Sequence, residues 1–192
     1  MVSRSYKTLK VPQLGGKLGP KATSVNGCYF ERLGECIPPL SAEHFISKNI
    51  LVKIGGISSK GIPWLSSLGI DLPPDALKVK CLCKGHNSFL APLDTFAGEL
   101  FDEVDKFWKL EKQTINVGSQ ALEHWMLKCL CGLISTGKIE FNGKKFSQTD
   151  IKNEWLNVLL GNSTLSNGLG LYIHFNLGDK IDTNKTIAIA PQ

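Results

Sequence analysis

The stretch "CLCKGHNSFLAPLD", residues 81–94, joins a pair of metal-ligand side chains to the start of an amphipathic helix. Cys83 and His86 are separated by two residues, a spacing that lets both bind one ion at a turn leading into a helix. From Asn87 onward, apolar residues recur every three or four positions, which predicts a helix with Pro92 near its start or at a break. The stretch therefore predicts a metal-stabilised core built against a helix.

Two cysteines far upstream complete a ligand set. Cys28 and Cys36 lie in polar, glycine-containing surroundings, and with Cys83 and His86 they would form a tetrahedral zinc site of three thiolates and one imidazole. Cys81 is an alternative to Cys83. The sequence shows no secretion signal, so the thiols are expected to be reduced and to serve metal binding or burial before disulfides.

The remaining cysteine pair has a different setting. Cys129 and Cys131 lie inside the strongly apolar stretch "ALEHWMLKCLCGLI" and are expected to be small core residues. His124, in the same stretch, is expected to be packed. His174, in "LYIHF", is expected to be structural or exposed.

An ionisable pair precedes another apolar run, in "LSAEHFISKNIL" at residues 40–51. Glu43 and His44 follow two prolines at 38 and 39, which exclude helix there and predict an extended or turn conformation. Taken alone, the pair is typical of surface residues at the start of an element. Asn87 is likewise a favoured helix cap, and Asp94, two helical turns further, is typical of a solvated helix residue.

Taken together, "SAEH" at 41–44 and "CKGHNSFLAPLD" at 83–94 resemble the HNH endonucleases, also called ββα-metal nucleases. The resemblance extends over residues 28–96. It implies an α+β fold with a ββα-metal (treble-clef-like) zinc-stabilised core. We expect a mainly helical C-terminal half to follow, ending in a short β-hairpin formed by residues 168–181 and 185–190.

The resemblance also implies a role for each matching residue. His44 would be the general base that activates water, and Glu43 and Asp94 would bind a catalytic Mg²⁺ or Mn²⁺ ion. Asn87 would hold the His44 segment in place or reach that metal. The zinc on Cys28, Cys36, Cys83 and His86 would be structural. Most family members carry His or Asn where this chain has Asp94.

Charge and composition set the remaining expectations. The net charge is +5, and residues 1–27 contain five basic residues and no acid, so we expect a basic N-terminal arm with little regular structure. Such an arm suits DNA contact or serves as a solubilising tail. No apolar run approaches a membrane span, and we expect a soluble cytoplasmic protein with no membrane partner.

These patterns predict three parts and one leading function. The arm is followed by a nuclease core at 28–96 and an elaboration at 97–192, which would form a homodimer or bind a regulatory protein. We expect an endonuclease that hydrolyses DNA, in restriction or phage defence. The alternative is a non-catalytic zinc-stabilised module that binds nucleic acid or protein. A thiol hydrolase, with Cys81 or Cys83 as nucleophile and His44 as base, would leave the other cysteines unexplained.

Overall fold

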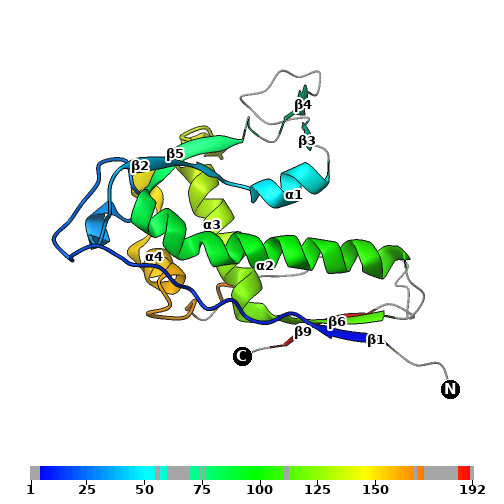
Figure 1. Ribbon diagram of the computed structural model, residues 1–192. Helices are drawn as coiled ribbons and strands as arrows, with labels where there is room; N and C mark the ends of the chain where they lie inside the picture. Colours follow the sequence, from blue (N-terminus) through cyan, green and yellow to red (C-terminus); the bar gives the residue numbers. More distant parts are fainter. Residues whose placement is uncertain are drawn as a thin grey trace.

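The long helix α2 (Lys84–Lys109) is the element around which the others are arranged (Figure 1). The structure is a computed structural model that describes residues 5–54, 57–59, 70–73, 75, 77–109, 113–166, 168–170 and 186–190. Pro92 lies within the first turns of α2 without ending it. The helix also runs without interruption past residues 96 and 97, where the sequence suggested a boundary between two parts.

An antiparallel pair of strands precedes α2. Strand β2 (Leu40–His44) pairs with β5 (Lys78–Cys83), and α2 begins at the residue after β5. The register shifts between Ser41 and Ala42, so the strand is locally irregular there. The last three residues of β5 are buried. The hairpin is thereby anchored on the core at the end where α2 starts.

Short elements lie in the connection between β2 and β5. They are α1 (Lys48–Lys53), β3 (Ile57–Ser59) and β4 (Ile70–Leu72), the last two paired antiparallel. Helix α1 lies directly on α2, where Gly98 faces Asn49. A Cβ atom on Gly98 would lie 2.2 Å from the Asn49 Nδ2 atom. Glycine at this position therefore leaves room for the Asn49 side chain against α2.

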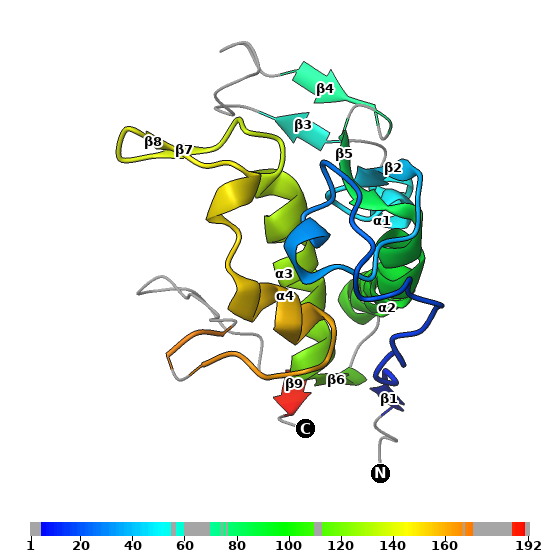
Figure 2. The same ribbon diagram turned by 90° about the vertical axis from the view of Figure 1, so that its left-hand side faces the viewer.

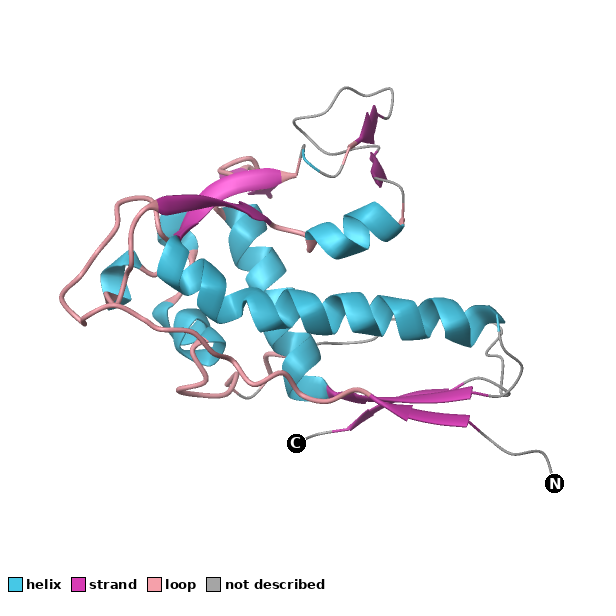
Figure 3. Ribbon diagram, in the orientation of Figure 1, coloured by secondary structure: helices cyan, strands magenta, loops and turns pink. Residues whose placement is uncertain are grey.

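A second sheet lies on the other side of α2 from the β2–β5 hairpin (Figure 3). It contains β1 (Ser5–Thr8), β6 (Gln113–Gly118) and β9 (Thr186–Ala190), in the order β1-β6-β9, with both pairs parallel. Residues 5–8 of the expected arm form strand β1. The strand expected within residues 185–190 is present as β9, which pairs in parallel with β6. The rest of the expected terminal hairpin, with His174, lies outside the described residues.

Helices α3 (Ser119–Ile134) and α4 (Asn153–Leu159) pack side by side next to α2 (Figure 2). Both were expected from the sequence. A small hairpin, β7 (Glu140–Phe141) with β8 (Lys144–Lys145), and the 3₁₀ helix η3 (Gln148–Asp150) connect them.

One hydrophobic core joins the two halves of the sequence. Its buried members include Leu82 and Leu90 from the first half and Cys131 and Leu156 from the second. A smaller core cluster lies between α2 and the three-stranded sheet, around Phe96 and Ile115. The fold is thus mixed α+β, as predicted. Within the described residues, no helix is long and apolar enough to cross a membrane.

Candidate metal centre and candidate active site

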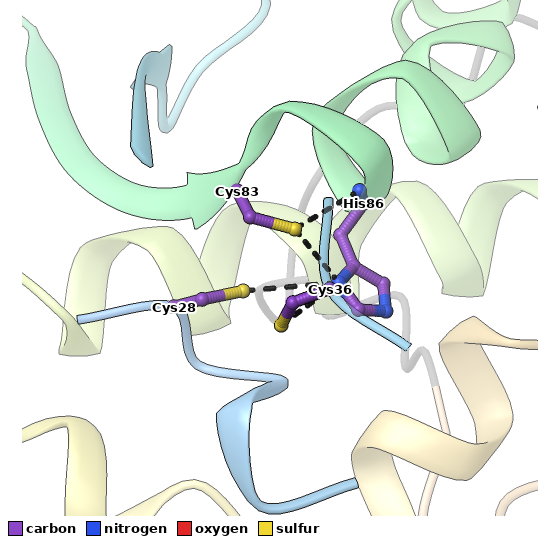
Figure 4. Close-up of side chains that lie close together, drawn as sticks. All are labelled: Cys28, Cys36, Cys83 and His86. Atoms are coloured by element: carbon purple, nitrogen blue, oxygen red, sulfur yellow. Dashed lines mark hydrogen bonds between the residues drawn. The ribbon is translucent and has the colours of Figure 1, made fainter. Parts of the chain in front are cut away.

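The ligand atoms of Cys28, Cys36, Cys83 and His86 all lie within 4.8 Å of one another, and all four residues are buried. The Nδ1 atom of His86 lies 3.1 Å from the Cys83 sulfur and 3.8 Å from each of the other two sulfurs (Figure 4). Sulfur and nitrogen ligands of one tetrahedral zinc ion are about 3.5 Å apart. One imidazole nitrogen cannot satisfy three thiols by hydrogen bonds. The four residues therefore form a group that can hold a metal such as zinc.

Three separate segments supply these ligands. Cys28 and Cys36 flank the 3₁₀ helix η1 (Glu31–Leu33), Cys83 ends β5, and His86 lies in the first turn of α2. A metal bound here would tie the N-terminal loop to the junction of β5 and α2. That junction is the point from which the hairpin and the long helix both extend.

The loop between Cys28 and Cys36 is longer than usual for a zinc ligand pair, and its backbone explains how it closes. Gly34 has a positive φ of 79°, and a Cβ atom there would lie 1.8 Å from the carbonyl oxygen of Lys21. Only glycine fits this turn without a clash. The compact turn brings Cys36 back beside Cys28.

Burial controls the protonation of these ligands. It lowers the pKa of His86 to about 4, so the imidazole is neutral at pH 7 and its nitrogen is free to bind metal. Burial raises the pKa of Cys28 and of Cys36, so these thiols hold their protons until a metal binds. The His86 ring also stacks on Phe30, with the ring centroids 4.3 Å apart, which fixes its orientation.

The other three cysteines lie outside this group. Cys83 rather than Cys81 joins the ligand cluster. Cys81 and Cys131 are buried and Cys129 is half-buried, as expected for the apolar pair on α3. Burial raises the pKa of each of these three thiols to about 12. Thiols this weakly acidic are poor nucleophiles, which does not favour a thiol hydrolase using Cys81.

Two carboxylates that are distant in the sequence meet at one ammonium group. Lys128 Nζ, on α3, lies 2.5 Å from Glu43 Oε1 on β2 and 2.5 Å from Asp94 Oδ2 on α2. Lys128 is 4% exposed, and Glu43 is also buried. Glu43 and Asp94 were expected to share a cation, and the structure brings their side chains together. It also adds a partner that the sequence reasoning missed.

The charges in this cluster are strongly coupled. Burial lowers the pKa of Lys128, but Asp94 and Glu43 outweigh it and raise the pKa overall, so the side chain stays an ammonium. Burial raises the pKa of Glu43, while Lys128 acts in the opposite direction. Counted by formal charge, one ammonium and two carboxylates give the cluster a net charge of −1.

Hydrogen bonds hold Asp94 in place from α1 and α3. Ser47 Oγ donates to Asp94 Oδ1 at 2.5 Å, and the indole nitrogen of Trp125 donates to Ser47 Oγ at 2.9 Å. The side-chain amide of Asn49 donates to the carbonyl oxygen of Asp94 at 2.8 Å. Asp94 is therefore a junction between three helices, which a solvated helix residue would not be.

Asn87 reaches back to the strand that carries the acidic–histidine pair. Its Nδ2 atom donates to Ser41 Oγ at 3.0 Å, and Ser41 Oγ donates to the carbonyl oxygen of Leu82 at 3.1 Å. Asn87 thus ties α2 to β2 just before Glu43. Asn87 is the fourth residue of α2, so it is not the helix cap that its residue type alone suggested.

His44 lies on the other face of the hairpin from Glu43. It is the register partner of Lys78, and its Nε2 atom lies 3.5 Å from Asp75 Oδ1. Burial and then the neighbouring Lys78 lower the pKa of His44, so the imidazole is neutral at pH 7. A neutral, 14% exposed imidazole can accept a proton.

Three residues that contact Glu43, Asp94 or His44 were not identified from the sequence: Lys128, Ser47 and Asp75. Lys128 had a usable signal, because a lysine in the middle of an otherwise apolar helix needs a buried partner. Ser47 and Asp75 carry no such signal, since serine and aspartate are common in loops. His124 is buried, as expected, and burial lowers its pKa.

Comparisons with known proteins found no relative of this chain. No protein-family model matches the sequence, no curated protein matches it significantly, and no solved structure matches the fold significantly.

Proposed function

We propose that this protein is a metal-dependent endonuclease of the HNH, or ββα-metal, type that hydrolyses phosphodiester bonds in DNA. One observation supports it most. Glu43 and Asp94, 51 positions apart, bring their carboxylates onto one cation, and the next residue of β2, His44, is a neutral, partly exposed histidine on the other face of the hairpin. The order of the elements, β2, β5 and α2, agrees with the proposal.

The carboxylate pair has the donor chemistry of a catalytic divalent cation site. Carboxylate oxygens are preferred ligands of Mg²⁺ and Mn²⁺. The ammonium group of Lys128 stands between Glu43 and Asp94, so a divalent cation would bind there once that ammonium has moved aside. When bound, the ion would stabilise the negative charge that develops on the phosphate and on the leaving 3′ oxygen.

His44 would carry the proton chemistry. Its neutral imidazole takes a proton from the water that attacks the phosphorus atom. Asn87 positions this residue indirectly, because its hydrogen bond to Ser41 fixes strand β2. The zinc on the Cys₃His group would be structural, holding the start of α2 against the N-terminal loop.

A second function is favoured by Lys128. An ammonium that already neutralises one of the two carboxylates makes them a structural ion-pair cluster, which suits a zinc-stabilised module that binds nucleic acid without cutting it. The two functions differ in whether the carboxylates bind Mg²⁺ or Mn²⁺ and in whether the protein cleaves DNA.

Plasmid cleavage tests the proposal. Zinc-loaded wild type is incubated with supercoiled DNA, with and without Mg²⁺ or Mn²⁺, beside Glu43→Gln and the matched control Asp105→Asn on the exposed end of α2. We expect cleavage only with the added cation, a loss of about 100-fold or more in Glu43→Gln, and no change in the control. Wild type that binds DNA but never cuts it would refute the nuclease and leave the binding module.

A further inference from the structure

On the face of the hairpin that carries His44, three nitrogen groups converge on one oxygen atom. Asp75 Oδ1 lies 2.6 Å from Lys78 Nζ, 3.5 Å from His44 Nε2 and 3.7 Å from Lys48 Nζ. The three groups come from β5, β2 and α1, so no single element creates the cluster. It is a convergence of donors of the kind that binds an anion.

The strand register explains why these groups share a face. His44 and Lys78 are direct partners in the antiparallel pair, and partners project to the same side of a hairpin. Lys80, two residues along β5, is exposed and projects to that side as well. The hairpin thus presents His44 and two lysines together, next to Lys48 at the start of α1.

The Asp75 carboxylate, which lies among these three nitrogen groups, is bound only weakly. Asp75 is 64% exposed, and ion pairs that are open to solvent contribute little to stability. His44 Nε2 is buried beneath it and, among the described residues, has no hydrogen-bond partner of normal geometry. Asp75 therefore covers the imidazole without satisfying it. An anion with several oxygens would satisfy the same donors better.

We propose that Asp75 is an internal substitute for a DNA backbone phosphate, which displaces it, binds Lys48 and Lys78, and uncovers His44. The inference rests on the proposed function for the choice of DNA as ligand. It goes further by assigning two phosphate-binding lysines and a self-blocking carboxylate, none of which belongs to the sequence motif.

Charge and position favour phosphate over a protein carboxylate as the natural ligand. Lysines bind phosphate as point charges, and a strand with two exposed lysines can follow a backbone with repeated charges. The cluster also lies at the residue proposed as the general base, which is where the phosphate to be cut has to be held.

Binding to a short fluorescein-labelled DNA duplex tests the inference without any cleavage. Anisotropy is measured on zinc-loaded protein with no Mg²⁺ or Mn²⁺ added, over a range of salt concentrations. The variants are Lys48→Ala, Lys78→Ala and Asp75→Asn. Lys109→Ala and Asp105→Asn are the matched controls, because these two residues form an exposed ion pair at the C-terminal end of α2.

We expect each of Lys48→Ala and Lys78→Ala to weaken binding about 5-fold and to reduce the slope of log affinity against log salt by about 0.9. Asp75→Asn should tighten binding about 3-fold, because the competing anion is gone. The inference is overturned if wild type does not bind DNA. It is also overturned if Asp75→Asn matches Asp105→Asn, or if Lys48 and Lys78 matter no more than Lys109.

The two proposals fail separately. A protein that binds DNA through these lysines but never cleaves it refutes the nuclease and keeps the phosphate site. A protein that cleaves DNA with Asp75, Lys48 and Lys78 all dispensable for binding refutes the phosphate site and keeps the nuclease.

Discussion

Two buried polar clusters, one at the β5–α2 junction and one where β2, α2 and α3 meet, pair their polar groups in different ways. The Cys₃His group gathers four ligand atoms that need one common partner, which a metal ion such as zinc supplies. The cluster of Glu43 and Asp94 contains its own cation, Lys128. Buried polar groups have to be paired in either case. We therefore expect the first cluster to depend on a bound metal for its stability, whereas the second contains its own cation.

Removing one ligand of the first cluster should have the largest effect. Cys83→Ser should reduce bound zinc to background and unfold the core, because structural zinc sites contribute on the order of 10 kcal/mol. Metal analysis and circular dichroism would measure this. Cys129→Ser, outside the cluster, should keep its zinc. A Cys83→Ser protein that stays folded with full zinc would mean that the four residues do not form the metal site.

Lys128→Met should have the next largest effect. It leaves two carboxylates facing each other in a buried site, and the loss of one partner of a buried ion pair costs about 3–5 kcal/mol. Denaturant unfolding of zinc-loaded protein would measure it. The triple variant Glu43→Gln, Asp94→Asn, Lys128→Met should recover much of the loss. A single variant as stable as wild type would show that Lys128 is not the cation of the cluster.

The Lys128→Met variant also tests whether the carboxylates of the second cluster can bind a divalent ion. Without the ammonium, the carboxylates have the full charge for a divalent ion, so Mg²⁺ or Mn²⁺ should raise the melting temperature of Lys128→Met more than that of wild type. Equal shifts in both proteins would indicate that the carboxylates do not bind the ion, which favours the binding module.

Trp125→Phe should have a smaller effect. It removes the donor to Ser47 Oγ and loosens Asp94, at a cost of about 1–2 kcal/mol. The matched control is Trp155→Phe on α4. If the two substitutions were equally mild, the hydrogen-bonded chain from Trp125 to Asp94 would contribute nothing measurable to the second cluster.

Lys78→Ala should have the smallest effect, a rise in the pKa of His44. Lys78 lowers that pKa by repelling the protonated imidazole, and its removal also frees Asp75 to pair with the imidazolium. A histidine NMR titration would measure the change, with Lys109→Ala as the control. A pKa that stayed the same or fell would mean that Lys78 does not act on His44.

The metal centre was largely predictable from the sequence, and the reason is local. Cys83 and His86 are separated by two residues, and thiol and imidazole ligands stand out in a reduced protein. The sequence left Cys81 and Cys83 open as ligands, because both project to the same side of β5 and the choice depends on where along the strand the loop at Cys28 lies. Burial and register decide that, and neither can be read from spacing.

The second cluster was only half predictable. Glu43 and Asp94 came from a motif, but Lys128 lies 34 positions beyond Asp94 and reaches it only because α3 packs back on the hairpin. Gly132 makes that packing close, since a Cβ atom there would lie 2.8 Å from the Phe45 Cβ atom. For the same reason, strand β1 in the expected arm was missed, because its partner β6 is about a hundred residues away in the chain.

The most direct test of the central claim is single-turnover cleavage of a DNA duplex by wild type and His44→Ala. Both proteins should first show the same zinc content and melting temperature. With Mg²⁺ or Mn²⁺ present, we predict that wild type cleaves and that the substitution slows the rate at least about 100-fold, the usual contribution of a general base. Cleavage by His44→Ala at the wild-type rate would contradict the proposed mechanism.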